Sequence, residues 1–291
     1  MSGRIVACVK WVDLRPDVDS LTGRVINDVR TSGWSPADLA AVELGLTIAE
    51  AWSVSLDVVC CGPTEAERGL RELAAAGATS VTRIDPGSIE HAPSTHASSA
   101  DVAEALARAL TASGQATLVL CGDYSLDRGS GSVPAFLAHH LGASQALGVT
   151  AVDPAELGRV LVTRRLGGGR SERLELRGPM VVSVEGSVAR LRRAGLRATM
   201  NATDATINVV EWGGSSSSTH HVRSVSMLPL RPRPRALPAP AGADARDRIL
   251  SLTGALVDRT PPRTIHATAD EAADAIMSQL RQWGYLDAAD S

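Results

Sequence analysis

A glycine- and serine-rich loop at residues 122–132 is the part of this chain whose composition best suits a chemical task. The apolar run before it, Leu118 to Cys121, predicts a buried strand, and Val133 to Leu141 after it predict a helix. Glycines let the backbone turn its N–H groups inward, serines add hydroxyl donors, and a helix begins with unpaired N–H groups. This combination can hold a phosphate without a lysine, although a plain structural turn has a similar composition.

The other residues with chemical potential give weaker signals. Asp123 and Asp127 suit hydrogen bonds to backbone N–H groups or ribose hydroxyls better than roles as bases or metal ligands. Each of the four cysteines lies in or at the end of an apolar run, and none forms a C-x-x-C pair, which predicts reduced thiols and no metal site. No Ser/His/Asp or Cys/His arrangement is recognisable, so we predict no catalytic residue.

Composition excludes several classes of partner. The net charge of −3 gives no basic field for nucleic acid. No apolar run approaches the roughly 18 residues of a membrane span, and no charged-then-apolar leader precedes the first strand, so we expect a soluble, cytoplasmic protein. Only Lys10 among the 29 basic residues is a lysine, which we interpret as coding bias.

Strand-like and helix-like segments alternate through the first half of the chain. Ser35-Pro36-Ala37-Asp38 has the features of a helix start, with a capping serine, an early proline and an acid in the first turn. This alternation predicts an α/β fold with an open, mostly parallel Rossmann-like sheet. The predicted strands cover residues 4–12, 55–62, 80–85 and 118–121, and the predicted helices follow Ser35 and Pro63 and cover 99–112 and 133–141.

Beyond residue 150 the pattern changes. Residues 158–178 predict a hairpin that turns at residues 167–169, and residues 179–186 predict another strand. Residues 213–242 are rich in serine and proline, and a terminal helix with an apolar stripe follows them. We therefore expect a nucleotide-binding α/β domain at residues 1–212 and an arm for partner docking at residues 213–291.

Several short motifs together indicate a family. Through them the chain resembles, nearly end to end, the β subunit of electron transfer flavoproteins, and its arginine-rich character is similar to an actinobacterial branch associated with mycofactocin redox systems. The departures from the family pattern are Ser35 in place of an asparagine, Ser132 in place of a glutamine, Pro134 in place of a glycine, and residues 201–205 in place of a lysine-rich run. The motifs are Cys8-Val9-Lys10, Ser35-Pro36-Ala37-Asp38, Cys61-Gly62-Pro63, Ala76-Gly77-Ala78, the loop from Gly122 and the run from Val162 to Val184.

The resemblance implies an electron-carrier subunit and not an enzyme, with a domain similar to the adenine nucleotide alpha hydrolases. It implies AMP in this subunit, FAD at the interface with an α subunit (or a second FAD replacing AMP), and flavin or nicotinamide dehydrogenases as partners. It also implies that Leu196 is the hydrophobic anchor for docking. Carried over residue by residue, the cofactor-binding residues are Cys8, Ser35, Pro36, Ala37, Asp38 and Cys61 near the adenine and ribose, and Gly122, Asp123, Tyr124, Ser125, Leu126, Asp127, Arg128, Gly129, Ser130, Gly131, Ser132 and Val133 near the phosphate.

Two other classes of function remain open from the residues alone. A stand-alone nucleotide-binding regulatory domain of the universal-stress type shares the sheet and the loop, but it needs neither the hairpin nor the arm. An ATP-using ligase or pyrophosphatase usually has a glycine- and serine-rich loop after its first strand, where this chain has Lys10-Trp11-Val12-Asp13.

Overall fold

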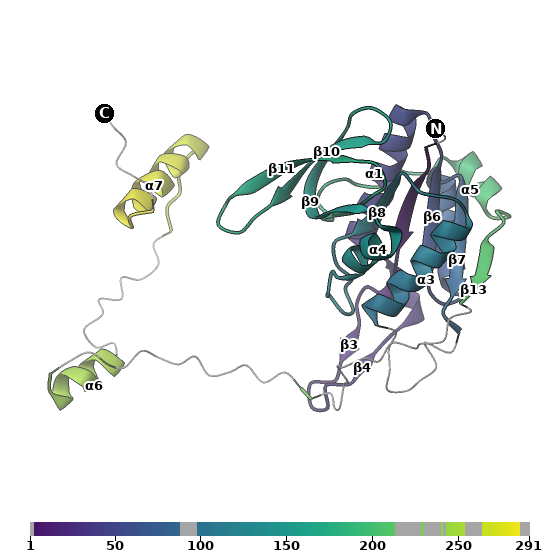
Figure 1. Ribbon diagram of the computed structural model, residues 1–291. Helices are drawn as coiled ribbons and strands as arrows, with labels where there is room; N and C mark the ends of the chain where they lie inside the picture. Colours follow the sequence, from purple (N-terminus) through teal and green to yellow (C-terminus); the bar gives the residue numbers. More distant parts are fainter. Residues whose placement is uncertain are drawn as a thin grey trace. The chain divides into compact units, whose positions relative to one another are not determined.

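A computed structural model describes residues 3–87, 98–212, 228–229, 240, 243–253 and 264–285 (Figure 1). The chain forms two compact units, Met1–Leu230 and Arg231–Ser291. Within the described ranges, no helix has the length and apolarity needed to cross a membrane.

The first unit is built on a nine-stranded sheet in the order β11-β10-β9-β12-β8-β1-β6-β7-β13. The seven strands β9-β12-β8-β1-β6-β7-β13 each pair in parallel with their neighbours. At the other end of the sheet, β10 pairs antiparallel with both β9 and β11. The α/β prediction and the hairpin are therefore confirmed. The strands are β1 (Ile5–Val9), β6 (Leu56–Cys61), β7 (Ser80–Asp85), β8 (Leu118–Gly122), β9 (Ser144–Pro154), β10 (Arg159–Arg165), β11 (Ser171–Arg177), β12 (Met180–Val184) and β13 (Asn208–Glu211).

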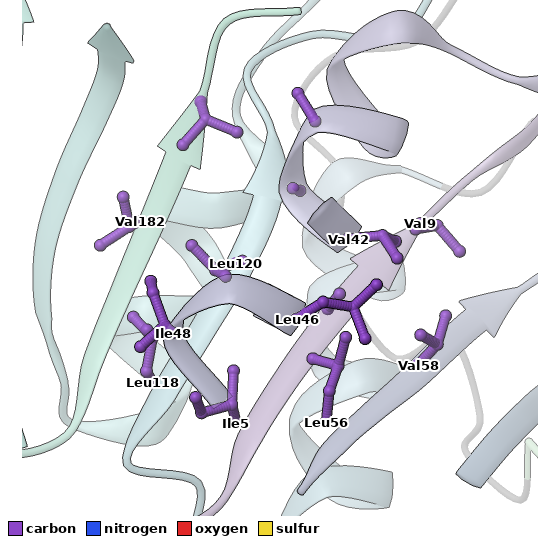
Figure 2. Packing of buried hydrophobic residues seen from close by; sticks show 14 of the residues in the cluster. Ile5, Val9, Val42, Leu46, Ile48, Leu56, Val58, Leu118, Leu120 and Val182 are labelled. Carbon is purple, nitrogen blue, oxygen red and sulfur yellow. The ribbon is translucent and has the colours of Figure 1, made fainter. Parts of the chain in front are cut away.

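Helices cover both faces of the sheet. On one face, α1 (Pro36–Trp52) and α2 (Ala66–Ala76) pack in a core with Ile5, Leu118 and Val182. Figure 2 shows Val42, Leu46 and Ile48 of α1 among the strand side chains of this core. On the other face, α3 (Ser99–Ala112) and α4 (Val133–Leu141) pack over the alternate side chains of the same strands, such as Val6 and Cys8. This alternation is the period-two pattern of a strand buried on both faces.

The start of α1 has the predicted cap. Ser35 Oγ accepts a hydrogen bond from the Asp38 backbone N–H at 3.1 Å, and Pro36 is the first helical residue. The same hydroxyl donates to the Asp38 carboxylate at 2.8 Å. These bonds fix the side chain of Asp38 at the helix start.

The segment before α1 contains short strands that the sequence analysis does not predict. The predicted strand over residues 4–12 divides at Lys10, because the Lys10 backbone N–H bonds to Asp38 and the chain then leaves the main sheet. Beyond Lys10, β2 (Trp11–Asp13) pairs antiparallel with β5 (Ser32–Trp34). A short hairpin of β3 (Asp17–Val18) and β4 (Val25–Ile26) and a 3-10 turn, η1 (Val29–Thr31), lie between them.

After β12 the chain crosses back to the other edge of the sheet. Arg192 bonds to Glu43 of α1 through its backbone N–H at 2.9 Å and its guanidinium at 2.8 Å. The helix α5 (Leu196–Ala202) follows, and β13 then pairs with β7. This cross-connection fastens the segment after β12 onto α1.

The second unit contains α6 (Ala245–Thr253) and α7 (Ala269–Gln282). The predicted terminal helix is confirmed as α7, which begins with a capping box of Thr268 and Glu271 and includes Ala273, Ile276 and Leu280. Among its described residues α7 has no buried side chain. Most of the predicted serine- and proline-rich arm, residues 213–227, 230–239 and 241–242, lies outside the described residues.

Candidate functional site

A pocket opens at the carboxyl edge of the sheet, between β1 and β8. From β1 the chain continues to β6 and β7 on one side, and β8 lies on the other side of β1. The connections after β1 and β8 therefore diverge, and open α/β sheets bind ligands at such a point. The glycine- and serine-rich loop lies here because it follows β8 directly.

Many of the residues expected to bind a cofactor line this one pocket. Those that line it are Cys8, Asp38, Cys61, Gly122, Asp123, Tyr124, Ser125, Arg128, Ser130, Gly131, Ser132 and Val133. Ser35, Pro36, Ala37, Leu126, Asp127 and Gly129 do not line it. Leu196 lies elsewhere, at the start of α5, with 79% of its surface exposed.

A row of serine hydroxyls forms one rim of the pocket. Ser130 Oγ lies 3.2 Å from Ser99 Oγ and 3.0 Å from Ser132 Oγ, so the row joins the loop to the start of α3. Ser132 precedes α4 and makes no side-chain bond to the helix, which leaves the first N–H groups of α4 without a side-chain cap. Hydroxyls and helix N–H groups at one rim suit an anionic group of a ligand.

Gly131 allows the loop to fold tightly over the end of β8. Its φ is +60°, and a Cβ at this position would lie 2.7 Å from the Asp123 carbonyl oxygen. Gly129 has the same φ, but a Cβ there would meet nothing closer than the Ser125 carbonyl at 3.7 Å. Position 131 therefore requires glycine for both conformation and space, and position 129 for conformation alone.

An ion pair joins the loop to the end of β1. Lys10 Nζ lies 2.8 and 2.6 Å from the two carboxylate oxygens of Asp127. Burial alone raises the pKa of Asp127, but hydrogen bonds from Lys10 and Ser125 and the lysine charge outweigh it and hold this pKa below its usual value. Asp127 thus stays ionised and positions the loop, although it does not line the pocket.

Asp38 brings the start of α1 against the end of β8. Its carboxyl group is buried, and this burial raises its pKa to about 6 against the opposing effect of the Ser35 hydrogen bonds. A Cβ on Gly122 would lie 3.0 Å from Asp38 Oδ1, and one on Gly186 would lie 3.0 Å from the Ala37 nitrogen. The backbones therefore approach closely here, and of residues 35–38 only Asp38 lines the pocket.

Cysteines and aliphatic side chains form the inner part of the pocket. Cys8 and Cys121 are direct neighbours in the β1–β8 register. A hydrogen bond of the Cys121 thiol with Cys8 that favours the protonated form, together with burial, raises the pKa of Cys121 well above its usual value, so this thiol stays neutral. Val102, Leu106 and Val133 complete an apolar lining that suits the flat face of a base.

The pocket also contains residues that the sequence did not single out as cofactor-binding. Ser99, Val102 and Leu106 come from α3, and Lys10 lines the opening. The residues of α3 were missed because only the packed structure brings the helix to the loop. The described residues contain no cluster of three potential metal ligands.

Comparisons with known proteins identify the family of the chain. Residues 24–212, more than half of the chain, match the electron transfer flavoprotein domain. The chain is also similar to the electron transfer flavoprotein subunit beta of Chromohalobacter salexigens, with 31% identity over 188 residues. That match covers 62% of this chain and 66% of the relative. The chain therefore belongs to the electron transfer flavoprotein family.

Proposed function

We propose that this chain is the nucleotide-binding β subunit of a heterodimeric electron carrier. In this proposal the chain binds AMP, or a second FAD in its place. The redox-active FAD lies at the interface and is bound mainly by an α subunit. The observation that supports the proposal best is the pocket at the β1–β8 divergence, with its apolar lining and its row of serine hydroxyls.

The residues present fit an adenine nucleotide. Cys8, Val102 and Cys121 offer an uncharged surface to a base, and Ser130, Ser132 and the first turn of α4 offer donors to a phosphate. When FAD is bound to the dimer, its flavin supplies the electron chemistry. The task of this chain is then to hold the nucleotide and to build the interface.

Exposed apolar side chains support the proposed partners. Leu196 and Met200 of α5 are 79% and 66% exposed, and we assign them to docking on flavin or nicotinamide dehydrogenases. We assign the apolar stripe of α7 to the α subunit. None of the four cysteines forms a disulfide bond, which supports the cytoplasm as the compartment of this carrier.

The test is to identify the nucleotide that the full chain carries. The chain is co-expressed with an electron transfer flavoprotein α subunit, purified and denatured, and the released nucleotides are quantified by chromatography and mass spectrometry. We expect about one adenylate per chain, and a clear loss of it when Ser130 and Ser132 are both changed to alanine. The control is Ser171→Ala on the exposed strand β11. Protein that releases neither AMP nor FAD refutes the proposal.

A further inference from the structure

Asp123 has a buried carboxylate oxygen with no hydrogen-bond partner. Its Oδ1 is shielded from solvent, and no described residue donates to it. The other such atoms among the described residues, the indole nitrogens of Trp34, Trp52 and Trp212 and Nε of Arg159, belong to residues outside the pocket. Because a buried acceptor without a donor is costly, an orphaned oxygen in a pocket points to a donor on the ligand.

The backbone holds Asp123 at a defined place. Its N–H donates to the Val184 carbonyl at 3.0 Å, which continues the β8–β12 pairing by one residue. Its own carbonyl lies directly against the turn at Gly131. Asp123 therefore lies between the inner lining, which ends at Cys121, and the rim at Ser132.

The Asp123 carboxylate itself disfavours a phosphate directly beside its unpaired oxygen. Burial raises the pKa of its carboxyl group, the Tyr124 backbone N–H partly opposes this, and the nearby Glu185 raises it further. Glu185 is itself paired with Arg165 at 2.9 Å, so the unpaired Oδ1 of Asp123 is the stronger indication. A carboxylate oxygen accepts hydrogen bonds, and the ligand group beside Asp123 is therefore a hydrogen-bond donor.

We propose that Asp123 accepts a hydrogen bond from a ribose hydroxyl and makes the pocket selective for ribonucleotides over deoxyribonucleotides. The inference rests on the proposed function. A nucleotide with its base on the inner lining and its phosphate at the serine rim places its sugar between the two, at the level of Asp123. A carboxylate on a ribose hydroxyl is an arrangement that α/β sheets favour.

The test measures affinities of the full chain, freed of nucleotide by dialysis, by isothermal titration calorimetry. The probes are AMP, 2′-deoxy-AMP, 3′-deoxy-AMP and purine riboside 5′-monophosphate, which lacks the amine of adenine. We expect AMP to bind roughly ten- to hundredfold more tightly than at least one deoxy analogue, as for a hydrogen bond to a charged group. In Asp123→Ala this preference should shrink to less than about threefold, because the side chain and the hydroxyl form one interaction.

Two further variants make the result specific. Asp123→Asn keeps an acceptor oxygen of nearly the same shape and should retain part of the ribose preference. Asp204→Ala removes an exposed aspartate and should bind all four probes like the wild type. Circular dichroism confirms that each variant is folded. If Asp123→Ala does not fold, a ribose preference in Asp123→Asn as large as in the wild type overturns the inference, and a smaller one supports it.

The outcomes separate this inference from the function on which it rests. Equal binding of AMP and both deoxy analogues by the wild-type chain overturns the role of Asp123 and leaves adenylate binding intact. If the purine riboside probe binds the wild-type chain more weakly than AMP, and this difference in affinity disappears in Asp123→Ala, the adenine amine is the donor and the ribose assignment is overturned. A wild-type chain that binds none of the four probes overturns the proposed function itself.

Discussion

Replacement of Gly131 is the most direct test of the loop. In Gly131→Ala the left-handed φ of +60° costs an L-residue roughly 1–2 kcal/mol. The new Cβ also lies 2.7 Å from the Asp123 carbonyl oxygen, so the loop must move, because the hydrogen bond to Val184 holds Asp123 in the sheet. We expect a further loss of about 1–2 kcal/mol from this contact, similar to the cost of other overpacked positions. Gly131→Val should cost more free energy than Gly131→Ala, because a β-branched residue tolerates this φ least.

Gly129 provides a matched control for this change. Gly129→Ala carries the same strain, since its φ is also +60°, but its Cβ has ordinary space. The difference between the two variants therefore isolates the contact with Asp123. We expect AMP affinity to fall roughly tenfold further in Gly131→Ala than in Gly129→Ala, since about 1.4 kcal/mol corresponds to a factor of ten.

The assay combines calorimetric titration with AMP, nucleotide extraction and far-ultraviolet circular dichroism. The circular dichroism spectrum should stay unchanged, because the loop lies outside the sheet. Full nucleotide occupancy in Gly131→Val, or equal losses in the two alanine variants, refutes the assignment of this loop to the ligand.

Three other predictions concern the rest of the molecule. The pKa of Asp38 is raised to about 6 in the folded chain, so the native state binds this proton more tightly than the unfolded state does. The free energy of unfolding should therefore fall by up to about 3 kcal/mol as the pH rises from about 4 to 6. Urea titrations at several pH values should show that Asp38→Asn removes this pH dependence. The same pH dependence in Asp38→Asn as in the wild type would contradict the prediction. Arg192→Ala should lower the free energy of unfolding by about 1 kcal/mol, a modest loss because the ion pair of Arg192 with Glu43 is partly exposed. It should also speed amide hydrogen exchange over residues 186–202, whereas the control Arg193→Ala should change neither quantity. Deletion of residues 213–291 should leave a folded α/β domain that no longer retains an α subunit in co-purification. If the truncated chain still retains the α subunit fully, the docking role of the arm is contradicted. If the truncated chain does not fold, α7 stabilises its own chain.

Local patterns predicted most of the sheet and its helices. Residues 99–112 and 133–141 were predicted as helices with the bounds that the structure has, because their apolar periodicity is a local signal. The strand β9 (Ser144–Pro154) was missed, since its sequence contains small and polar residues and its pairing with β12 and β10 decides its form. The small strands β3, β4 and β5 were missed because each is two or three residues long.

The site was predictable to the extent that its residues lie close in sequence. The loop composition located the pocket, whereas the contacts that complete it join distant segments. Lys10 and Asp127 are 117 residues apart, and Ser99 and Ser130 are 31 apart. No periodicity connects such positions, and only the order of the strands brings them together.

The ion pair between Lys10 and Asp127 offers a practical handle. Since Lys10 is the only lysine in the chain, amine-reactive dyes have a single side-chain target apart from the terminal α-amine. That target stands at the opening of the pocket and touches the loop. A fluorophore attached there removes the charge of Lys10 and therefore the ion pair, so it would report from one known position how the loop and the ligand behave without that pair. It would do so without engineered cysteines that compete with the four native thiols.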